Sequence, residues 1–254
     1  MKPQGAVCRI ALLDALRGLA VIQMVLYHGI YDWVYVFGRE ARWFTDSQNA
    51  YLWEQVICWS FILIAGAVFP YGKKPVRRGL QVFGCALVLT GVTLAVLPSE
   101  RILFGVLHFL GASMLLSAAA KPVLARIPAA AGALACFALF LLFKQFPAGY
   151  LGVGDWRIWQ LPEAWYQMRW TFPLGLMGPD FYSADYFPLL PWLFLFWTGL
   201  YLWKLAAASP CMEQICRVPR VPVLDWVGRH SLLCYMLHQP VLLALVWLTG
   251  QIVR

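Results

Sequence analysis

Four ionisable residues within the first long apolar run are the residues best suited to chemistry. The run extends from Arg9 to Phe37 and contains Asp14, Arg17, His28 and Asp32. At about 100° per residue of α-helix, these four side chains fall within roughly 60° of one another. Ionisable groups in a membrane-spanning helix cost roughly 2.5–3.5 kcal/mol each, so they normally face a bundle interior or a water-filled cavity. The shared stripe predicts that this helix forms one wall of a functional site.

The residue types in this stripe indicate two kinds of chemistry. A histidine can take a proton from an attacking amine or hydroxyl, and a carboxylate one turn away can orient its ring. His28 and Asp32 have this spacing. Arg17 carries a guanidinium fork that suits a phosphate or a carboxylate. The structural alternative is that Asp14 and Arg17 form an ion pair at the helix end, and that His28 and Asp32 lie at the opposite membrane interface.

Counting helical rise from either membrane face predicts two clusters of polar residues. The cluster near the outer face contains His28, Asp32, His108 and Asp185, with Asp180 at the same mouth. The cluster in the inner half is basic and contains Asp14, Arg17, His230, Ser231 and His238. A polar stripe joining the two would let a donor enter from one side and an acceptor from the other, as a transmembrane group transfer requires.

Each of the three later histidines also has a purely structural interpretation. His108 is explained equally well as a hydrogen-bonded helix-packing residue. His238 precedes Pro240, which interrupts a helix and frees a carbonyl one turn earlier, so the imidazole can satisfy the broken helix. For His230, a role at the start of a helix is the favoured interpretation.

Composition identifies the class of protein. The 254 residues are 61% hydrophobic and 13% charged, with a mean hydropathy of +0.67; soluble domains are roughly 45–50% apolar and 25% charged. The formal net charge is +8, but the basic residues are spread over short loops, which argues against a nucleic-acid partner. The seven cysteines show no zinc-type spacing, so we expect no metal. The composition predicts an all-α, polytopic protein whose partner is the lipid bilayer.

Seven segments approach the roughly 20 residues that a membrane span requires, and together they predict one integral membrane domain over residues 1–254. These segments are Arg9–Phe37, Tyr51–Phe69, Leu80–Leu97, Ile102–Ala120, Ala129–Phe146, Phe187–Leu205 and His230–Ile252. The third and fourth are separated by a tight turn, so they should be antiparallel neighbours. Residues 147–186 break the pattern and predict either an ordered cap or a short re-entrant helix around 161–177.

The distribution of positive charge predicts the orientation. Of the 20 Lys and Arg residues, 12 fall on the side that holds the N-terminus and the loops 73–78 and 206–229, and 7 fall on the other side. Cytoplasmic loops carry the excess of positive charge, so the N-terminus should be cytoplasmic. The first helix should remain in the mature protein, because no small-residue cleavage site follows it.

Four segments, in this order, resemble a known family. They are LLDALRGLAVIQMVLYHGIYD, GVLHFLG, DYFPLLPW and GRHSLLCYMLHQPV, and the matching positions run from Asp14 to Val241. They are similar to small bacterial members of the heparan-α-glucosaminide N-acetyltransferase catalytic-domain family, a branch of the transmembrane acyltransferases.

This resemblance implies a reaction and the residues that serve it. The reaction would move an acetyl group from cytosolic acetyl-CoA to an amino sugar, or to another amine or hydroxyl acceptor, at the outer side of a bacterial cytoplasmic membrane. The positions that the resemblance carries over are the RG of ALRG, Arg17 and Gly18, on the donor side, and His28, which would be catalytic. The two predicted clusters add the other site residues: Asp14, Ser231 and His238 on the donor side, Asp32 and His108 as catalytic residues, and Asp180 and Asp185 on the acceptor side.

Two other classes of function stay open at this point. A small-molecule or ion transporter would also line a stripe with charges, but it predicts paired broken helices, and only the proline-rich sixth span fits that pattern. A non-catalytic membrane protein would leave the histidines replaceable. The sequence is compatible with a homodimer and does not require one.

Overall fold

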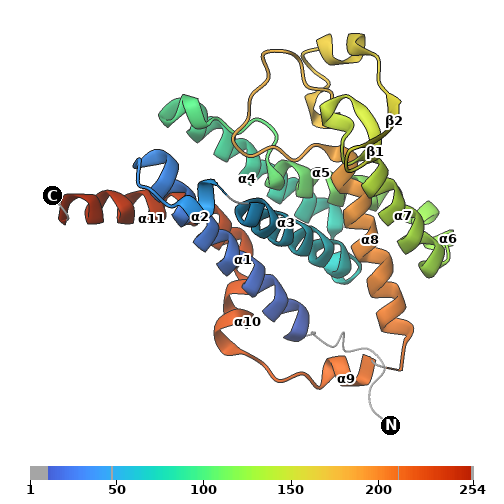
Figure 1. The fold of residues 1–254 in the computed structure, drawn as a ribbon. Coiled ribbons are helices and arrows are strands. Elements are labelled where there is room, and N and C mark those ends of the chain that lie inside the picture. The colour runs from blue at the N-terminus through green and yellow to red at the C-terminus, as the bar shows by residue number, and fades with distance from the viewer. Residues whose placement is uncertain (1–10, 47, 211, 253–254) are drawn as a thin grey trace. The chain divides into compact units, whose positions relative to one another are not determined.

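The computed structural model describes residues 11–46, 48–210 and 212–252, and these residues are predominantly helical (Figure 1). They divide into two compact units, Met1–Ile64 with Pro210–Arg254, and Ala65–Ser209. The boundary falls inside one continuous helix, α3 (Gln48–Val68). The single domain that the sequence predicts stays a prediction.

Among the described residues, six helices are long and apolar enough to cross a membrane: Ala11–Val36, Gln48–Tyr71, Pro75–Val96, Ala129–Ala148, Leu189–Ala208 and Ser231–Leu248. The predicted all-α, polytopic class is confirmed. The fourth predicted span is the shorter helix α5 (Val106–Ala119), whose 14 residues extend about 21 Å at the usual rise, less than the roughly 30 Å hydrocarbon core. Its apolar N-terminal flank is not helical, because residues 101–104 instead bond to residues 183–187.

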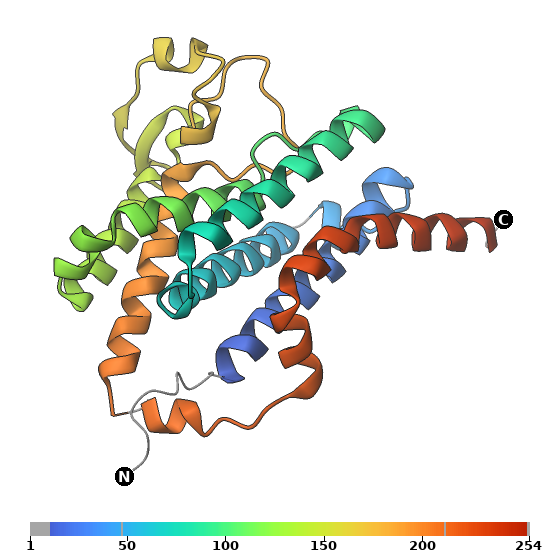
Figure 2. The ribbon, with the colours of Figure 1, turned by 180° about the vertical axis from the view of Figure 1, so that it is seen from behind.

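In the first unit, one helix packs along a pair of helices from the end of the chain. This helix is α1 (Ala11–Tyr31), and a short π-helix, η1 (Asp32–Val36), continues it. Its partners are α10 (Pro222–Arg229) and α11 (Ser231–Ile252), and Figures 1 and 2 both show the three side by side. The unit also contains α2 (Arg42–Thr45) and α9 (Met212–Cys216).

Two glycines let α1 and α10 touch backbone to backbone. A Cβ atom added at Gly18 would lie 2.0 Å from the carbonyl oxygen of Leu224, and one added at Gly228 would lie 1.9 Å from that of Asp14. Real Cβ atoms do not approach so closely. Both positions therefore require glycine in this packing, which gives Gly18 a structural role in addition to the donor-side role that the resemblance implies.

The second unit is built on two helix pairs. The first is α4 (Pro75–Val96) with α5, where a Cβ added at Gly111 would lie 2.8 Å from the backbone nitrogen of Phe83. This confirms the predicted neighbours. The second pair is α7 (Ala129–Phe143) with α8 (Leu189–Ala208). The short helix α6 (Lys121–Arg126) precedes α7 and also contacts α8. The predicted kink at the start of α8 is present, because Leu190 has non-helical φ and ψ values of −96° and 124°.

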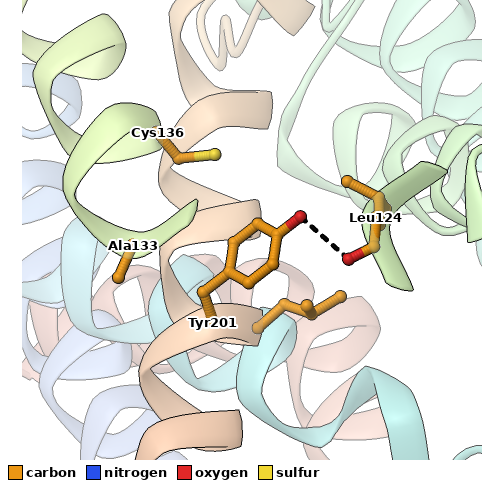
Figure 3. Close-up of a cluster of buried hydrophobic side chains, with 5 residues drawn as sticks. Leu124, Ala133, Cys136 and Tyr201 are labelled. Carbon is orange, nitrogen blue, oxygen red and sulfur yellow. Dashed lines mark hydrogen bonds between the residues drawn. The ribbon is translucent and has the colours of Figure 1, made fainter. Parts of the chain in front are cut away.

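A buried tyrosine ties α8 to α6 and α7 (Figure 3). The Tyr201 hydroxyl donates to the carbonyl oxygen of Leu124 at 3.0 Å, and Lys204 Nζ donates to the same oxygen at 3.0 Å. Gly132 makes room for the Tyr201 ring, since an added Cβ would lie 2.7 Å from it. The last turn of α6 is thereby held on α8.

Residues 146–188 form an ordered cap over one end of α7 and α8 (Figures 1 and 2). It contains the 3₁₀ turn η4 (Phe146–Ala148), an antiparallel hairpin of β1 (Tyr150–Val153) and β2 (Trp156–Gln160), and the 3₁₀ turns η5 (Glu163–Gln167) and η6 (Phe172–Leu174). The predicted ordered cap is confirmed. The alternative prediction, a re-entrant helix around 161–177, was wrong. Pro162, Pro173 and the left-handed Gly175 (φ +108°) interrupt any helix there.

Two phenols fix the cap. Tyr166 donates to the carbonyl oxygen of Phe146 at 2.5 Å, and Tyr186 donates to that of Phe172 at 2.6 Å. Burial raises the pKa of both hydroxyls above the usual value, so both keep the proton that they donate.

We predict that Gly18→Ala destabilises the first unit. The added methyl group overlaps the backbone of Leu224, and overpacking of this kind typically costs about 1–3 kcal/mol. Gly91→Ala is the matched control, because nothing lies within 4 Å of its Cβ position in α4; alanine there should gain up to about 1 kcal/mol of helix propensity. Thermal unfolding in detergent measures both, and equal midpoints would contradict the tight packing at Gly18.

Candidate functional site

The predicted polar stripe of α1 faces α10 and α11. Asp14 and Arg17 lie against α10, while His28 and Asp32 lie against α11. The stripe is therefore confirmed as a protein-facing surface. Its residues form two separate clusters along α1, one with each partner helix.

The first cluster, called here the charge cluster, consists of Asp14, Arg17, Asp225 and Arg229. Arg229 Nε lies 3.6 Å from Asp14 Oδ2, and its Nη2 lies 4.0 Å from Asp225 Oδ2. Arg17 Nη1 lies 4.0 Å from Asp14 Oδ1 and donates to the Gly228 carbonyl at 3.4 Å. Among the described residues, the cluster therefore joins two carboxylates with two guanidinium groups. The basic character expected for the inner group of residues stays a prediction.

The second carboxylate of the charge cluster belongs to a residue that the sequence analysis assigned to a loop. Asp225 is only 3% exposed, and neither of its carboxylate oxygens has a hydrogen-bond partner among the described residues. Its i,i+4 spacing to Arg229 within an amphipathic stretch was the available signal. Of the two arginines, Arg229 is the more accessible, with 34% of its side chain exposed against 17% for Arg17.

The second cluster, called here the histidine cluster, consists of His28, Asp32, His238 and Gln239. The rings of His28 and His238 lie with their centroids 5.0 Å apart. His238 Nδ1 lies 2.6 Å from the Tyr235 carbonyl oxygen, and a carbonyl only accepts, so Nδ1 carries a proton. In the neutral ring, Nε2 then holds the lone pair that a base needs.

His238 thus lies beside His28 and not at the level of Arg17, where the sequence analysis placed it. It is eight residues beyond His230, which corresponds to about 12 Å of helical rise. The start of α11 is near the charge cluster, and that rise carries His238 along α1 to the other cluster. The imidazole contacts the carbonyl of Tyr235, whereas the carbonyl that Pro240 leaves without its helical donor is that of Met236, so the expected satisfaction of the broken helix stays a prediction.

A carboxylate and an amide close the histidine cluster. Gln239 Nε2 donates to both oxygens of Asp32, at 2.8 and 3.0 Å. Asp32 is almost fully buried and begins the π-helical turn, a feature that is frequent at functional sites. Gln239 Oε1 is buried without a hydrogen-bond partner among the described residues, which leaves one acceptor in the cluster for a ligand N–H or O–H.

His108 and Asp185 belong to the second unit, where both hold the start of α5. Asp185 Oδ2 accepts from the backbone N–H of Val106 at 3.0 Å. His108 Nδ1 accepts a hydrogen bond from the backbone N–H of Gly105 at 3.3 Å, so the proton of the neutral ring is on Nε2. Nε2 lies 3.3 Å from Thr90 Oγ1. Both ring nitrogens are engaged, which favours the helix-packing interpretation of His108. Its grouping with His28 stays a prediction.

The remaining predicted residues, Asp180, His230 and Ser231, belong to neither cluster. Asp180 is exposed in a turn of the cap. His230 is exposed between α10 and α11, where its Nδ1 lies 2.8 Å from the Trp226 carbonyl oxygen, as the helix-boundary interpretation expects. Ser231 is the first residue of α11.

Sequence reasoning missed a polar contact on another face of α1. Trp53 Nε1 donates to Gln23 Oε1 at 2.9 Å, and the Tyr27 hydroxyl donates to Glu54 Oε2 at 3.3 Å. Glu54 is a carboxylate inside the second candidate span. The sequence analysis did not consider this residue, although an ionisable side chain inside a predicted span was itself the signal.

In the part of the chain that the structure describes, no group of three or more His, Cys, Asp or Glu side chains could hold a metal ion. The expectation that no metal takes part stays a prediction.

The fold is that of an integral membrane helical bundle, and its two clusters of polar side chains lie between packed helices. The family described as heparan-alpha-glucosaminide N-acetyltransferase, catalytic, matches residues 9–240, and the chain belongs to this family of membrane acetyltransferases. The match covers every residue of both clusters, which extend in sequence from Asp14 to Gln239. Searches of curated proteins and of solved structures gave no significant match.

We predict that Thr90→Val weakens the second unit without impairing a catalytic step. The substitution removes the hydroxyl that donates to the Ile102 carbonyl at 2.6 Å and contacts His108, and losing a buried hydrogen bond costs about 1–3 kcal/mol. The unfolding midpoint should fall. Acetyl transfer per folded molecule should stay at the wild-type rate, whereas a loss of a hundredfold or more would restore His108 to the catalytic machinery.

Proposed function

We propose that the protein is an acetyl-CoA-dependent transferase that acetylates an amine or hydroxyl, with the histidine cluster as the catalytic centre. The observation that carries this proposal is the pairing of His28 with His238 beside the Asp32–Gln239 contact, in a chain of the N-acetyltransferase family. An amino sugar is the acceptor that the family description suggests.

The proposed reaction needs a base and a route for one proton. The nucleophile's nitrogen or oxygen attacks the thioester carbonyl carbon, the carbon–sulfur bond breaks, and coenzyme A leaves as a thiolate. His28 takes the proton from the attacking atom and gives it to the thiolate, so charge and atoms balance. His238, with a fixed tautomer, stands beside His28 and can share that proton.

Asp32 and Gln239 are proposed as positioning residues. Asp32 provides a fixed negative charge one turn from His28, which favours the imidazolium that forms during transfer. Gln239 holds that carboxylate, and its second polar atom, Oε1, is available to accept from the acceptor molecule's N–H or O–H. The acceptor would then be held within the same cluster that deprotonates it.

The donor is proposed to bind from the side of the charge cluster. Arg17 and Arg229 supply guanidinium groups that suit the phosphates of acetyl-CoA, and 34% of the Arg229 side chain is exposed. About 17 Å of helical rise separates Arg17 from His28, a span suited to the extended pantetheine arm.

The sidedness of the reaction follows from the charge distribution. The excess of Lys and Arg supports a cytoplasmic N-terminus, hence a cytosolic donor and an acceptor arriving at the outer face of a bacterial cytoplasmic membrane. Asp180 and Asp185, in and beside the cap, are kept as proposed acceptor-side residues. A homodimer is compatible with this proposal and is not required by it.

We predict that His28→Ala lowers the rate of acetyl transfer by roughly 10²–10⁴-fold, the usual contribution of a general base. The protein should still insert, fold and bind donor. Asp32→Asn should lose less, because the imidazole remains and only its electrostatic support is reduced. The measurement is acetyl transfer in proteoliposomes against a panel of amino-sugar and hydroxyl acceptors.

His230→Ala is the control for this series, because His230 is exposed and bonds within its own helix turn. It should keep the wild-type rate. If His28→Ala keeps near-wild-type turnover on an accepted substrate, the base is elsewhere, and His238→Ala becomes the next variant to measure. A transporter or a non-catalytic protein would show no acetyl transfer at all with the wild-type chain.

We predict that Arg17→Lys weakens acetyl-CoA binding. Lysine keeps the charge but loses the planar fork that grips a phosphate through two parallel hydrogen bonds. Arg217→Lys is the control, since Arg217 is exposed and pairs with Glu213 on a surface helix. Calorimetric titration with acetyl-CoA measures both, and an unchanged affinity in folded Arg17→Lys would reduce Arg17 to a structural ion pair.

A further inference from the structure

The short helix α10 buries a polar face against the protein and exposes an apolar one, the reverse of a usual surface helix. Asp225 is buried, and Gly228 contacts the backbone of Asp14, so this face meets α1. Val223 and Trp226 lie on the opposite face of the helix and are 68% and 57% exposed. A helix on a water-soluble surface buries its apolar face and exposes its polar one. The polarity of α10 is that of a helix whose outer face meets an apolar medium.

The position of α10 along α1 gives its depth. Leu224 touches Gly18, which is seven residues beyond Ala11, where the first candidate span begins. That distance is about 10 Å of helical rise. Leu16 and Leu19, on either side of this level of α1, are 41% and 44% exposed, as lipid-facing residues of a spanning helix are. Both α1 and α10 therefore carry exposed apolar side chains at this depth.

From this reversed polarity and this depth, we propose that the outer face of α10, formed by Val223 and Trp226, is a lipid-binding surface. Acyl chains of the leaflet around the N-terminal half of α1 cover it, and α10 is a membrane-embedded helix instead of part of a cytoplasmic loop. Amphipathic helices of this kind bury their apolar face about 5–10 Å into the boundary between headgroups and acyl chains.

This placement explains how the charge cluster is kept at membrane depth. Lipid in direct contact with Asp14 or Asp225 would impose a large desolvation cost. The backbone of α10 stands between those carboxylates and the acyl chains, and its inward face supplies Arg229 as their counter-charge. The inference concerns the setting of the cluster and does not depend on acetyl transfer.

The test is fluorine NMR of the full chain, labelled with fluorotryptophan, in nanodiscs of phosphatidylcholine and phosphatidylglycerol. The resonance of Trp226 is assigned by its loss in Trp226→Phe. A nitroxide on the lipid acyl chain should broaden this resonance several-fold more than a water-soluble nickel chelate does. Trp203, buried and bonded to Tyr71 within the second unit, is assigned in the same way and should respond weakly to both reagents.

Two results would overturn the proposal. Stronger broadening by the nickel chelate would show that α10 faces water. Protection from both reagents, together with disulfide crosslinking of Trp226→Cys between two chains, would show that a second copy covers this face.

A charge substitution tests the same surface without a label. Val223→Asp should lower the yield of folded protein extracted from membranes, because it places a carboxylate in lipid, whereas Val223→Leu should not. Arg220→Asp, at an exposed position just before the helix, is the matched control and should also fold. Equal yields for Val223→Asp and Val223→Leu would contradict a lipid-facing α10.

Discussion

The backbone contact between α1 and α10 is the constraint on which the polar interior of the first unit depends. Gly18 and Gly228 remove the side chains that would separate the two helices, and each glycine lies against a carbonyl of the other helix. At this separation, Arg229 of α10 can reach Asp14 of α1, and Arg17 can reach the carbonyl of Gly228. A larger residue at either glycine would open the contact and leave carboxylates at membrane depth with weaker partners.

The same contact sets the position of the histidine cluster. The chain turns at His230 directly after α10, so α11 starts near the charge cluster and runs along the C-terminal half of α1. Helical rise then brings His238 to His28 and Gln239 to Asp32. The charge cluster thus lies between α1 and α10, and the histidine cluster lies between the end of α1 and α11.

Polar groups in the second unit are satisfied in a different way. His108 and Asp185 accept from backbone N–H groups at the start of α5, which the first turn of the helix leaves without intrahelical partners. Thr90 donates to the carbonyl of Ile102, just before the helix. This arrangement also joins the segment before α5 to the segment before α8. A histidine used in this way shows why an ionisable residue in an apolar segment indicates a constraint and not necessarily a catalyst.

The sequence by itself determined the helical membrane class, the stripe on α1, the antiparallel α4–α5 pair and the family. These features depend on composition, helical periodicity and local motifs, which a single segment carries. It did not determine the partners of the stripe. Asp225 and Gln239 are separated from Asp14 and Asp32 by more than 200 positions, and no local pattern encodes contacts across such a distance.

Only the tertiary structure decided that α10 is a packed helix with Asp225 inside, that Arg229 pairs with Asp14, and that His238 lies beside His28. The physical reason is that these facts depend on how closely and at what level helices pack. Two glycines far apart in sequence set both quantities, and a glycine in an apolar run does not by itself indicate which helix it will meet. The cap was undecided for a related reason, because prolines and glycines exclude a helix without specifying the hairpin that replaces it.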